Sequence, residues 1–442
     1  MMPLIVIAAT IALLLVLVLY FRWPAFLALI SCAVFCGLSL GMPGAAVLSS
    51  IQSGMGGTLG FVAVIVGLGA LIGAILEASG GIDALAQRAI RRGAAVRSRL
   101  TLGFLGALVG IPVFFDVAFI IMFPFVLALA HRLEVKPITL VIPLLAGLAV
   151  GHSFIPPTPG PIAVAGLLGA DIALVVIAGL ATGIPAMLVG GPLFVQIAKR
   201  GLVDGLQIGE LPPQPDARPV RPLAAASAIV ILIPLALMIT TASCVWLYPE
   251  TPIANVAAFI GHPFAALLLA CLLAMLIFSR IEGVERGAVR TAMTKAFEPA
   301  GIIVLVTGAG GAFKQVLVDS EGGQAFALML AGSGLPILVL AFAIAAAMRI
   351  SQGSATVAMV TAAGLTAPLV EIASISAWQT ALLVSAIASG ATLASHVNDS
   401  GFWLVNRYLQ QKVGQTLRSW TLASTLVGIS GLIVSGILWQ FA

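Results

Sequence analysis

The chain has 442 residues, of which 61% are hydrophobic and only 8% are charged. A soluble domain carries about 25% charged residues, so this sequence has too few polar side chains to cover a globule in water. It predicts an all-α, multi-pass membrane protein with the lipid bilayer as its main partner, and it excludes a soluble enzyme. The net charge of +5 does not indicate a nucleic-acid surface, because excess Lys and Arg in a membrane protein usually mark cytoplasmic loops.

Long apolar runs recur from one end of the chain to the other. A helix needs roughly 17–25 apolar residues to cross a bilayer. By this measure we expect crossing helices over residues 3–20, 24–41, 58–77, 138–169, 172–197, 222–247, 262–278, 299–318, 378–405 and 420–441. The first run lacks the basic segment and cleavage site of a signal peptide, so we expect it to be a retained helix.

Basic residues divide the predicted loops into two groups. They cluster between residues 88 and 99 and between residues 280 and 295, whereas the connections 249–261 and 319–334 contain no Lys or Arg. Because basic loops are normally cytoplasmic, we expect both termini to lie on the outer side.

Two further apolar stretches, residues 100–130 and 335–365, each contain 31 residues. A helix of this length would span about 46 Å, which is too long for one crossing of a ~30 Å hydrocarbon core. The first stretch is basic on both flanks and the second on neither, so each should enter and leave on the same side. We predict two re-entrant hairpins, broken at Gly110-Ile111-Pro112 and within Arg349–Gly353.

The order of these features repeats. Each half of the chain contains three helices, a hairpin, a broken helix and a last helix, and small residues between 60 and 86 match those between 301 and 327. Five crossings per half is an odd number, so the halves should have opposite orientations, as in many secondary transporters. We predict a first repeat over residues 1–197, a cytoplasmic linker over residues 198–221 and a second, inverted repeat over residues 222–442.

Four segments predict non-helical backbone near the membrane midplane, where it is tolerated only inside protein or beside a watery cavity. They are residues 110–116, 151–161, 349–356 and 395–401. The two broken helices, 138–169 and 378–405, would therefore be discontinuous. Arg349 is the only Lys or Arg between Lys314 and Arg407, and charged residues at membrane depth are costly and usually functional.

These four segments resemble those of the gluconate permease (gluconate:proton symporter) family. The matching runs are GIPVFFDV at 110–117, PPTPGP at 156–161, QGSATVA at 352–358 and SHVNDSGFW at 395–403, and the likeness extends over essentially the whole chain. The resemblance implies a secondary active transporter of the bacterial inner membrane that imports a small organic anion such as gluconate by proton symport, without a cofactor. It also suggests a homodimer and an elevator-like movement.

One position departs from the family pattern. Thr158 stands where members usually carry His. The family also includes permeases for D-serine and for other hydroxy acids, which remain alternative substrates.

We expect the substrate to bind where the breaks face one another, with Arg349 holding its carboxylate. A guanidinium can bind a carboxylate through two hydrogen bonds. The alternative is that Arg349 forms a permanent ion pair with Asp116 or Asp399. The other residues expected to bind substrate are His152, Thr158, Ser351, Gln352, Gly353, Ser354, Thr356 and Asn398.

Asp116, Asp399 and His396 are the candidates for carrying the coupled proton. A carboxylate desolvated at a hairpin tip binds a proton more readily than one in water. The structural alternatives are that Asp116 caps a half-helix and that the histidines only satisfy hydrogen bonds. Similarly, the hydroxyls near Arg349 could bond back to their own helix.

An intramembrane enzyme is the main alternative from another class. The sequence contains no HExxH motif, no nucleophile elbow and no Cys-His arrangement to support it. The four cysteines lie in apolar runs and predict packing rather than disulfides or a metal site. A channel is the second alternative, but charges confined to paired breaks favour an occluded site.

Overall fold

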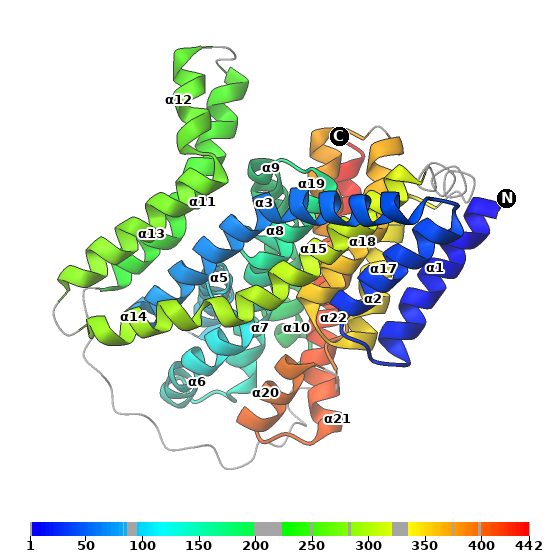
Figure 1. Cartoon of the computed structure of the whole chain (residues 1–442). Coiled ribbons are helices and arrows are strands. Elements are labelled where there is room, and N and C mark those ends of the chain that lie inside the picture. Colours follow the sequence, from blue (N-terminus) through cyan, green and yellow to red (C-terminus); the bar gives the residue numbers. More distant parts are fainter. Residues whose placement is uncertain are drawn as a thin grey trace.

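The computed structural model describes residues 2–82, 84–85, 95–198, 223–247, 251–281, 284–320, 335–373, 375–396 and 399–441. These residues form helices and connecting turns, with no strand among them. The all-α class predicted from composition is confirmed. Figure 1 shows most helices gathered in one body, from which the pair formed by α11 and α13 projects, with α12 at its far end.

The helices of the first half follow the chain in this order: α1 (Met2–Leu19), α2 (Ala25–Ser39), α3 (Gly44–Ala78), α5 (Ala95–Gly110), α6 (Phe115–Arg132), α7 (Ile138–Phe154), α8 (Pro159–Leu168), α9 (Ile172–Leu188), the π-helix η1 (Val189–Leu193) and α10 (Phe194–Ala198).

The helices of the second half are α11 (Leu223–Leu247), α12 (Pro252–Ile260), α13 (Pro263–Arg280), α14 (Arg286–Lys295), α15 (Phe297–Asp319), α17 (Ile337–Gln352), α18 (Ala355–Ala373), α19 (Ala377–Thr392), α20 (Ser400–Tyr408), α21 (Val413–Thr416), the π-helix η2 (Leu417–Thr421) and α22 (Leu422–Trp439).

The helical stretches have the length and apolarity of a multi-pass membrane protein. Within the described residues, six of them are long and apolar enough to cross a bilayer, and further, shorter apolar helices accompany them. The number of crossings, the inverted repeat and the re-entrant course of the hairpins stay predictions.

Three elements differ from the sequence expectation. Helix α3 begins at Gly44 rather than near Thr58, and α12 and α14 form where loops were expected. Hydropathy finds only runs long enough to fill a bilayer, so it missed two helices of nine and ten residues. It also missed the less apolar start of α3.

The chain leaves the helical conformation at the four predicted segments. α5 ends at Gly110 and α6 starts at Phe115; α7 ends at Phe154 and α8 starts at Pro159. In the second half, α17 ends next to Gly353, whose φ of 79° closes the helix in the left-handed region. α19 ends at Thr392 and α20 begins after Asp399.

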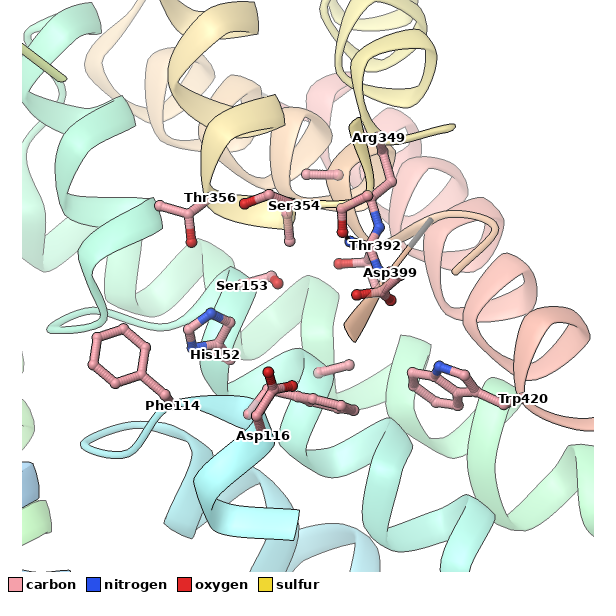
Figure 2. A pocket seen from close by; sticks show the side chains of 15 residues that line it. Phe114, Asp116, His152, Ser153, Arg349, Ser354, Thr356, Thr392, Asp399 and Trp420 are labelled. Carbon is pink, nitrogen blue, oxygen red and sulfur yellow. Dashed lines mark hydrogen bonds and ion pairs between the residues drawn. The ribbon is translucent and has the colours of Figure 1, made fainter. Parts of the chain in front are cut away.

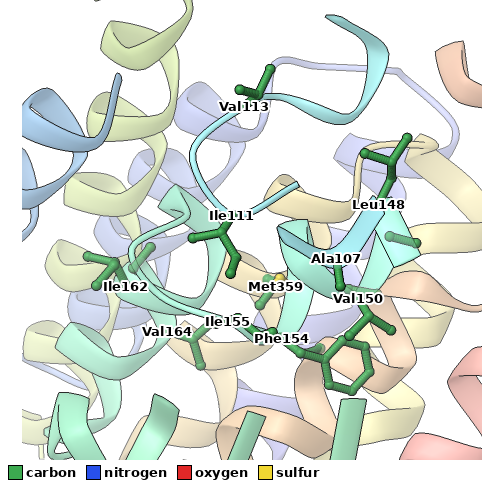
Figure 3. Packing of buried hydrophobic residues seen from close by; sticks show 14 of the residues in the cluster. Ala107, Ile111, Val113, Leu148, Val150, Phe154, Ile155, Ile162, Val164 and Met359 are labelled. Carbon is green, nitrogen blue, oxygen red and sulfur yellow. The ribbon is translucent and has the colours of Figure 1, made fainter. Parts of the chain in front are cut away.

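Glycines hold the first hairpin arm against the first half of a broken helix. A Cβ on Gly147 of α7 would lie 2.0 Å from the carbonyl oxygen of Gly103 on α5, and one on Gly151 would lie 2.2 Å from that of Ala107. Small residues allow helix backbones to approach this closely inside a membrane. Figure 3 shows Ala107 and Leu148 at this contact, with Phe154 and Met359 packed nearby. The break between α5 and α6 is thereby fixed next to the break between α7 and α8.

Candidate functional site

The four breaks surround one cavity of about 350 Å³ (Figure 2), which we call the polar cavity because charged and hydroxyl-bearing side chains line part of it. Side chains reach it from the tip of α6, the end of α7, the turn between α17 and α18, the end of α19, the start of α20 and the π-helix η2. Its lining residues are Phe114, Phe115, Asp116, Ala149, His152, Ser153, Arg349, Gly353, Ser354, Ala355, Thr356, Ala391, Thr392, Asp399 and Trp420. Residues far apart in the sequence therefore share a single site.

Arg349 is the positive group of this cavity. It lies in the last turn of α17 and is only 7% exposed. Its guanidinium donates one hydrogen bond to the carbonyl oxygen of Gly353 and forms an ion pair with Asp399. Carbonyl groups at a helix C-terminus favour a positive charge, so the end of α17 helps to hold Arg349 where the chain turns.

Asp399 is the buried partner of Arg349 and caps α20. It accepts a hydrogen bond from the backbone N–H of Gly401 at 3.1 Å and another from the hydroxyl of Ser395. The Ser395 hydroxyl in turn accepts a bond from the indole N–H of Trp420 at 2.8 Å. A continuous hydrogen-bonded chain thus runs from η2 through the α19–α20 break to the end of α17.

The side chain of Trp420 also connects this network to the first half of the protein. Its ring stacks on Phe115 with centroids 5.7 Å apart and ring planes at 25°. Phe115 is the residue before Asp116, which lies half-buried in the first turn of α6. Figure 2 shows Asp116 on the opposite side of the cavity from Arg349.

His152 lies at the end of α7 near Phe114, with ring centroids 6.0 Å apart. Its Nδ1 atom is buried and has no hydrogen-bond partner within the described part of the chain. Unpaired buried polar atoms are rare in proteins and are often found at functional positions. Ser153 and Thr392 add hydroxyls, although that of Thr392 donates back to the carbonyl of Ala388 at 2.8 Å.

Most residues predicted for the site line the cavity. Those brought together are Asp116, His152, Arg349, Gly353, Ser354, Thr356 and Asp399. The ion pair from Arg349 to Asp399 is one of the two structural alternatives considered for Arg349, so substrate binding by this side chain is a proposal.

The remaining predicted residues are placed differently. Thr158 is buried, donates its hydroxyl to the carbonyl of Ile155 at 2.6 Å and lines a small neighbouring space next to His152. His396 is not among the described residues lining the cavity; its carbonyl accepts a bond from the Asp399 N–H at 2.9 Å. Ser351 and Gln352 are the last residues of α17, and Asn398 lies outside the described residues.

Sequence reasoning missed Ser153, Thr392 and Trp420. Ser153 was within a predicted break but was not chosen, and its position next to His152 could have suggested it. Thr392 and Trp420 gave no local signal, because Thr392 lies inside an apolar run and Trp420 at the start of another. Both reach the site only through long-range packing.

The described residues contain no group of three or more side chains that could hold a metal ion. What they do contain is a polar cavity enclosed by interrupted helices of a multi-pass membrane protein. In secondary transporters, such interruptions place charged groups and helix ends around a substrate. Fold and site together define a membrane transporter.

Comparison with known proteins gives the family. The model of the GntP family permeases matches residues 2–442, and the chain belongs to this family. It is 39% identical over 433 residues to a low-affinity gluconate transporter of Escherichia coli (strain K12), covering 98% of this chain and 97% of that protein. It is 36% identical over 433 residues to the Gnt-II system L-idonate transporter of the same strain, covering 98% of each chain.

The fold also resembles a solved structure. The Alcanivorax borkumensis YdaH transporter superposes with a TM-score of 0.65 at 16% identity, covering 90% of this chain and 89% of that one. The family predicted from the four breaks is confirmed. The chain is a multi-pass transporter of the bacterial inner membrane, and the alternative of an intramembrane enzyme is set aside.

Proposed function

We propose that this transporter imports a small sugar acid such as gluconate together with protons. The observation that carries the proposal is the buried Arg349–Asp399 pair, which faces a cavity lined by hydroxyl groups. The volume of about 350 Å³ lies within the ~300–1,000 Å³ typical of small-molecule sites. Relatives named for gluconate and L-idonate support the choice of a polyhydroxylated carboxylate.

Arg349 would hold the carboxylate of the substrate. The start of α18 faces the same cavity through Ser354, Ala355 and Thr356, and backbone N–H groups at a helix start favour an anion. Ser153 and Thr356 supply hydroxyls, and the unpaired Nδ1 of His152 supplies a further polar contact. Together these groups suit a ligand that is anionic at one end and rich in hydroxyls along its length.

Charge balance supports proton coupling. In the structure, Arg349 and Asp399 neutralise each other. A substrate carboxylate that takes over Arg349 leaves Asp399 as an unpaired buried anion, which is costly. Uptake of one proton by Asp399 removes that cost directly, whereas uptake by the second cavity carboxylate, Asp116, would restore only the net charge of the cavity.

D-serine and other hydroxy acids are the alternative substrates. The hydroxyl of Thr158 is bonded to its own chain and lies beside the main cavity, so the proposal assigns it to the wall behind His152. Substrate choice would then depend mainly on the hydroxyls that line the cavity itself.

The test uses purified protein in proteoliposomes with radiolabelled gluconate. An inward proton gradient should drive accumulation above equilibrium, and a protonophore should abolish it. Unlabelled L-idonate, D-serine and lactate, each added in excess, rank the substrate classes. Lack of gluconate uptake, or of competition by any sugar acid, would refute the substrate assignment; accumulation independent of the proton gradient would refute the coupling.

The Asp116→Asn and Asp399→Asn variants locate the coupling group. Loss of the carboxyl that exchanges the proton should abolish accumulation and leave substrate exchange across the membrane in place. A variant that still concentrates gluconate against its gradient removes that carboxylate from the coupling role.

A further inference from the structure

A second and larger cavity lies away from the transport site. It has a volume of about 560 Å³ and is lined by residues of α3, α13 and α14. Both α13 and α14 pack against α3, and Figure 1 shows the course of these three helices. Its walls are apolar over most of their area and come from Leu71, Met275, Phe278, Val289, Met293 and Phe297. None of these residues lines the polar cavity.

Helix α14 gives this apolar cavity a positively charged edge. It has ten residues, none of which is buried, and at about 15 Å it is too short to cross a bilayer. Val289 and Met293 lie one turn apart and face the cavity, and so do Arg286 and Arg290. A short amphipathic helix of this kind is suited to the boundary between lipid head groups and acyl chains.

The two arginines are placed to receive an anion. Both are exposed, and Arg286 is oriented by a hydrogen bond of 2.8 Å to the carbonyl of Ser279, which also lines the cavity. The described lining residues include these two guanidinium groups and no carboxylate. Guanidinium groups bind phosphate through paired, charge-assisted hydrogen bonds.

Apolar walls of this extent do not suit water, which needs polar partners to occupy a cavity. An acyl chain suits them, and the bilayer around a multi-pass membrane protein supplies acyl chains. The basic residues of this region also mark the predicted cytoplasmic side, where basic pockets between helices bind anionic head groups.

We propose that this cavity binds an anionic phospholipid, with one acyl chain between α13 and α14 and the phosphate held by Arg286 and Arg290. The site is separate from the transport cavity, so it does not depend on which substrate is carried. A bound lipid would fill the gap under α14 and brace this helix against α3 just before the chain enters α15.

The experiment measures lipid binding by the full-length protein in detergent. Dioleoyl phosphatidylglycerol and dioleoyl phosphatidylcholine have the same chains and differ in head-group charge. Native mass spectrometry gives the affinity for each, and thermal unfolding gives the rise in Tm. The wild type should bind phosphatidylglycerol at least tenfold more tightly and show the larger rise in Tm with that lipid.

Two double variants separate the site from general charge effects. Arg286→Gln with Arg290→Gln should lose the preference for phosphatidylglycerol. Arg22→Gln with Arg418→Gln, which removes two basic residues elsewhere in the chain, should keep it. Val289→Trp, which fills the cavity and leaves the arginines, should weaken binding of both lipids.

Four results would overturn the proposal. One is equal affinity of the wild type for the two lipids, and another is full phosphatidylglycerol preference in the Arg286/Arg290 variant. The third is an equal rise in Tm from inorganic phosphate alone, which would make this an ion site. Loss of a dimer in the Arg286/Arg290 variant without any lipid effect would assign the cavity to a second copy of the chain and overturn it as well.

Discussion

Arg349 and Asp399 form a buried pair that still faces the cavity. Removing one partner of such a pair typically costs about 3–5 kcal/mol, because it leaves the other charge unpaired. A substrate carboxylate can replace Asp399 as the partner of Arg349, but Asp399 then has to bind a proton to avoid that cost. The pair therefore keeps two buried charges in balance, and Arg349 faces the cavity where it can meet an anion.

Arg349→Lys tests this view of the residue. Lysine keeps the charge, and hence an ion pair to Asp399, but cannot form the two-pronged contact with a carboxylate. We expect a folded, inserted protein whose Kd for gluconate rises at least tenfold, equivalent to about 1.4 kcal/mol.

Isothermal calorimetry on the purified variant measures the affinity, and Arg22→Lys, which changes an exposed arginine outside the cavity, serves as the control. Unchanged gluconate affinity in Arg349→Lys would leave Arg349 with only its structural ion pair.

The functional role of a single residue could be predicted from the sequence where a charged side chain lies in a long apolar stretch. Arg349 is the only Lys or Arg between Lys314 and Arg407. A charged side chain that far inside an apolar region is energetically costly, so the sequence alone indicated that Arg349 is functional. Its partner Asp399 could be proposed only together with Asp116, because sequence does not tell which carboxylate a guanidinium will meet. The hydrogen-bonded chain from Trp420 through Ser395 to Asp399 was missed, because it depends on how η2 and α22 pack against the break between α19 and α20.

At the scale of elements, the π-helix η2, which directly precedes α22, places the side chain of Trp420 at the cavity. A π-helical turn contains one residue more than an α-helical one and frequently occurs at functional positions. In η2 this turn includes Trp420, which reaches both Ser395 and Phe115.

Trp420→Phe isolates the hydrogen bond from the stacking. Phenylalanine keeps an aromatic ring against Phe115 and removes the N–H donor to Ser395, which should cost about 0.5–1.5 kcal/mol. Because Ser395 helps to hold Asp399, we expect KM for gluconate to rise severalfold in liposome uptake assays. The matched change is Trp439→Phe at the far end of α22, which should leave KM unaltered; equal effects of the two changes would rule out a positioning role for Trp420.

The glycine contact between α5 and α7 is a second property of elements. Gly147→Ala would force the two backbones apart, because its Cβ meets a carbonyl oxygen at 2.0 Å. Overpacking of this kind costs about 1–3 kcal/mol, so the Tm in detergent should fall. Gly56→Ala in α3 meets nothing within 4 Å and should leave the Tm unchanged or slightly raised; an equal response of both variants would contradict the close α5–α7 contact.

Breaks in helices were easier to predict than whole helices. Proline and glycine at 110–112 and 156–161 act on their own backbone, and the chain does interrupt its helices there. Helix α14 was missed because it has only ten residues and no long apolar run.

At the scale of the whole molecule, the course of the chain through the membrane can be tested by labelling. The sequence predicts that Arg91 and Lys136, on either side of the α5–α6 hairpin, lie on the cytoplasmic face; Arg91 lies outside the described residues. In a cysteine-free background, Arg91→Cys and Lys136→Cys should both be blocked by a permeant maleimide and spared by an impermeant one added outside. Labelling from opposite faces would mean that the hairpin crosses the membrane. The homodimer also stays a prediction at this scale.

Helix α3 presents almost bare backbone where it meets the two tips of the first half. A Cβ on Gly73 would lie 2.1 Å from the carbonyl oxygen of Pro112, and one on Gly69 would lie 3.1 Å from that of Pro157. At these two positions α3 has no side chain between its backbone and the tips, so no Cβ of α3 would have to be passed if the tips moved along it. An elevator-like movement, implied by the resemblance to gluconate permeases, would require such a smooth surface between α3 and the two tips. Gly73→Ala adds a Cβ to this surface, and we expect it to lower the maximal rate of uptake while the Kd for gluconate stays the same. A variant that binds gluconate more weakly but transports at the normal maximal rate would show that Gly73 shapes the binding site and not the movement.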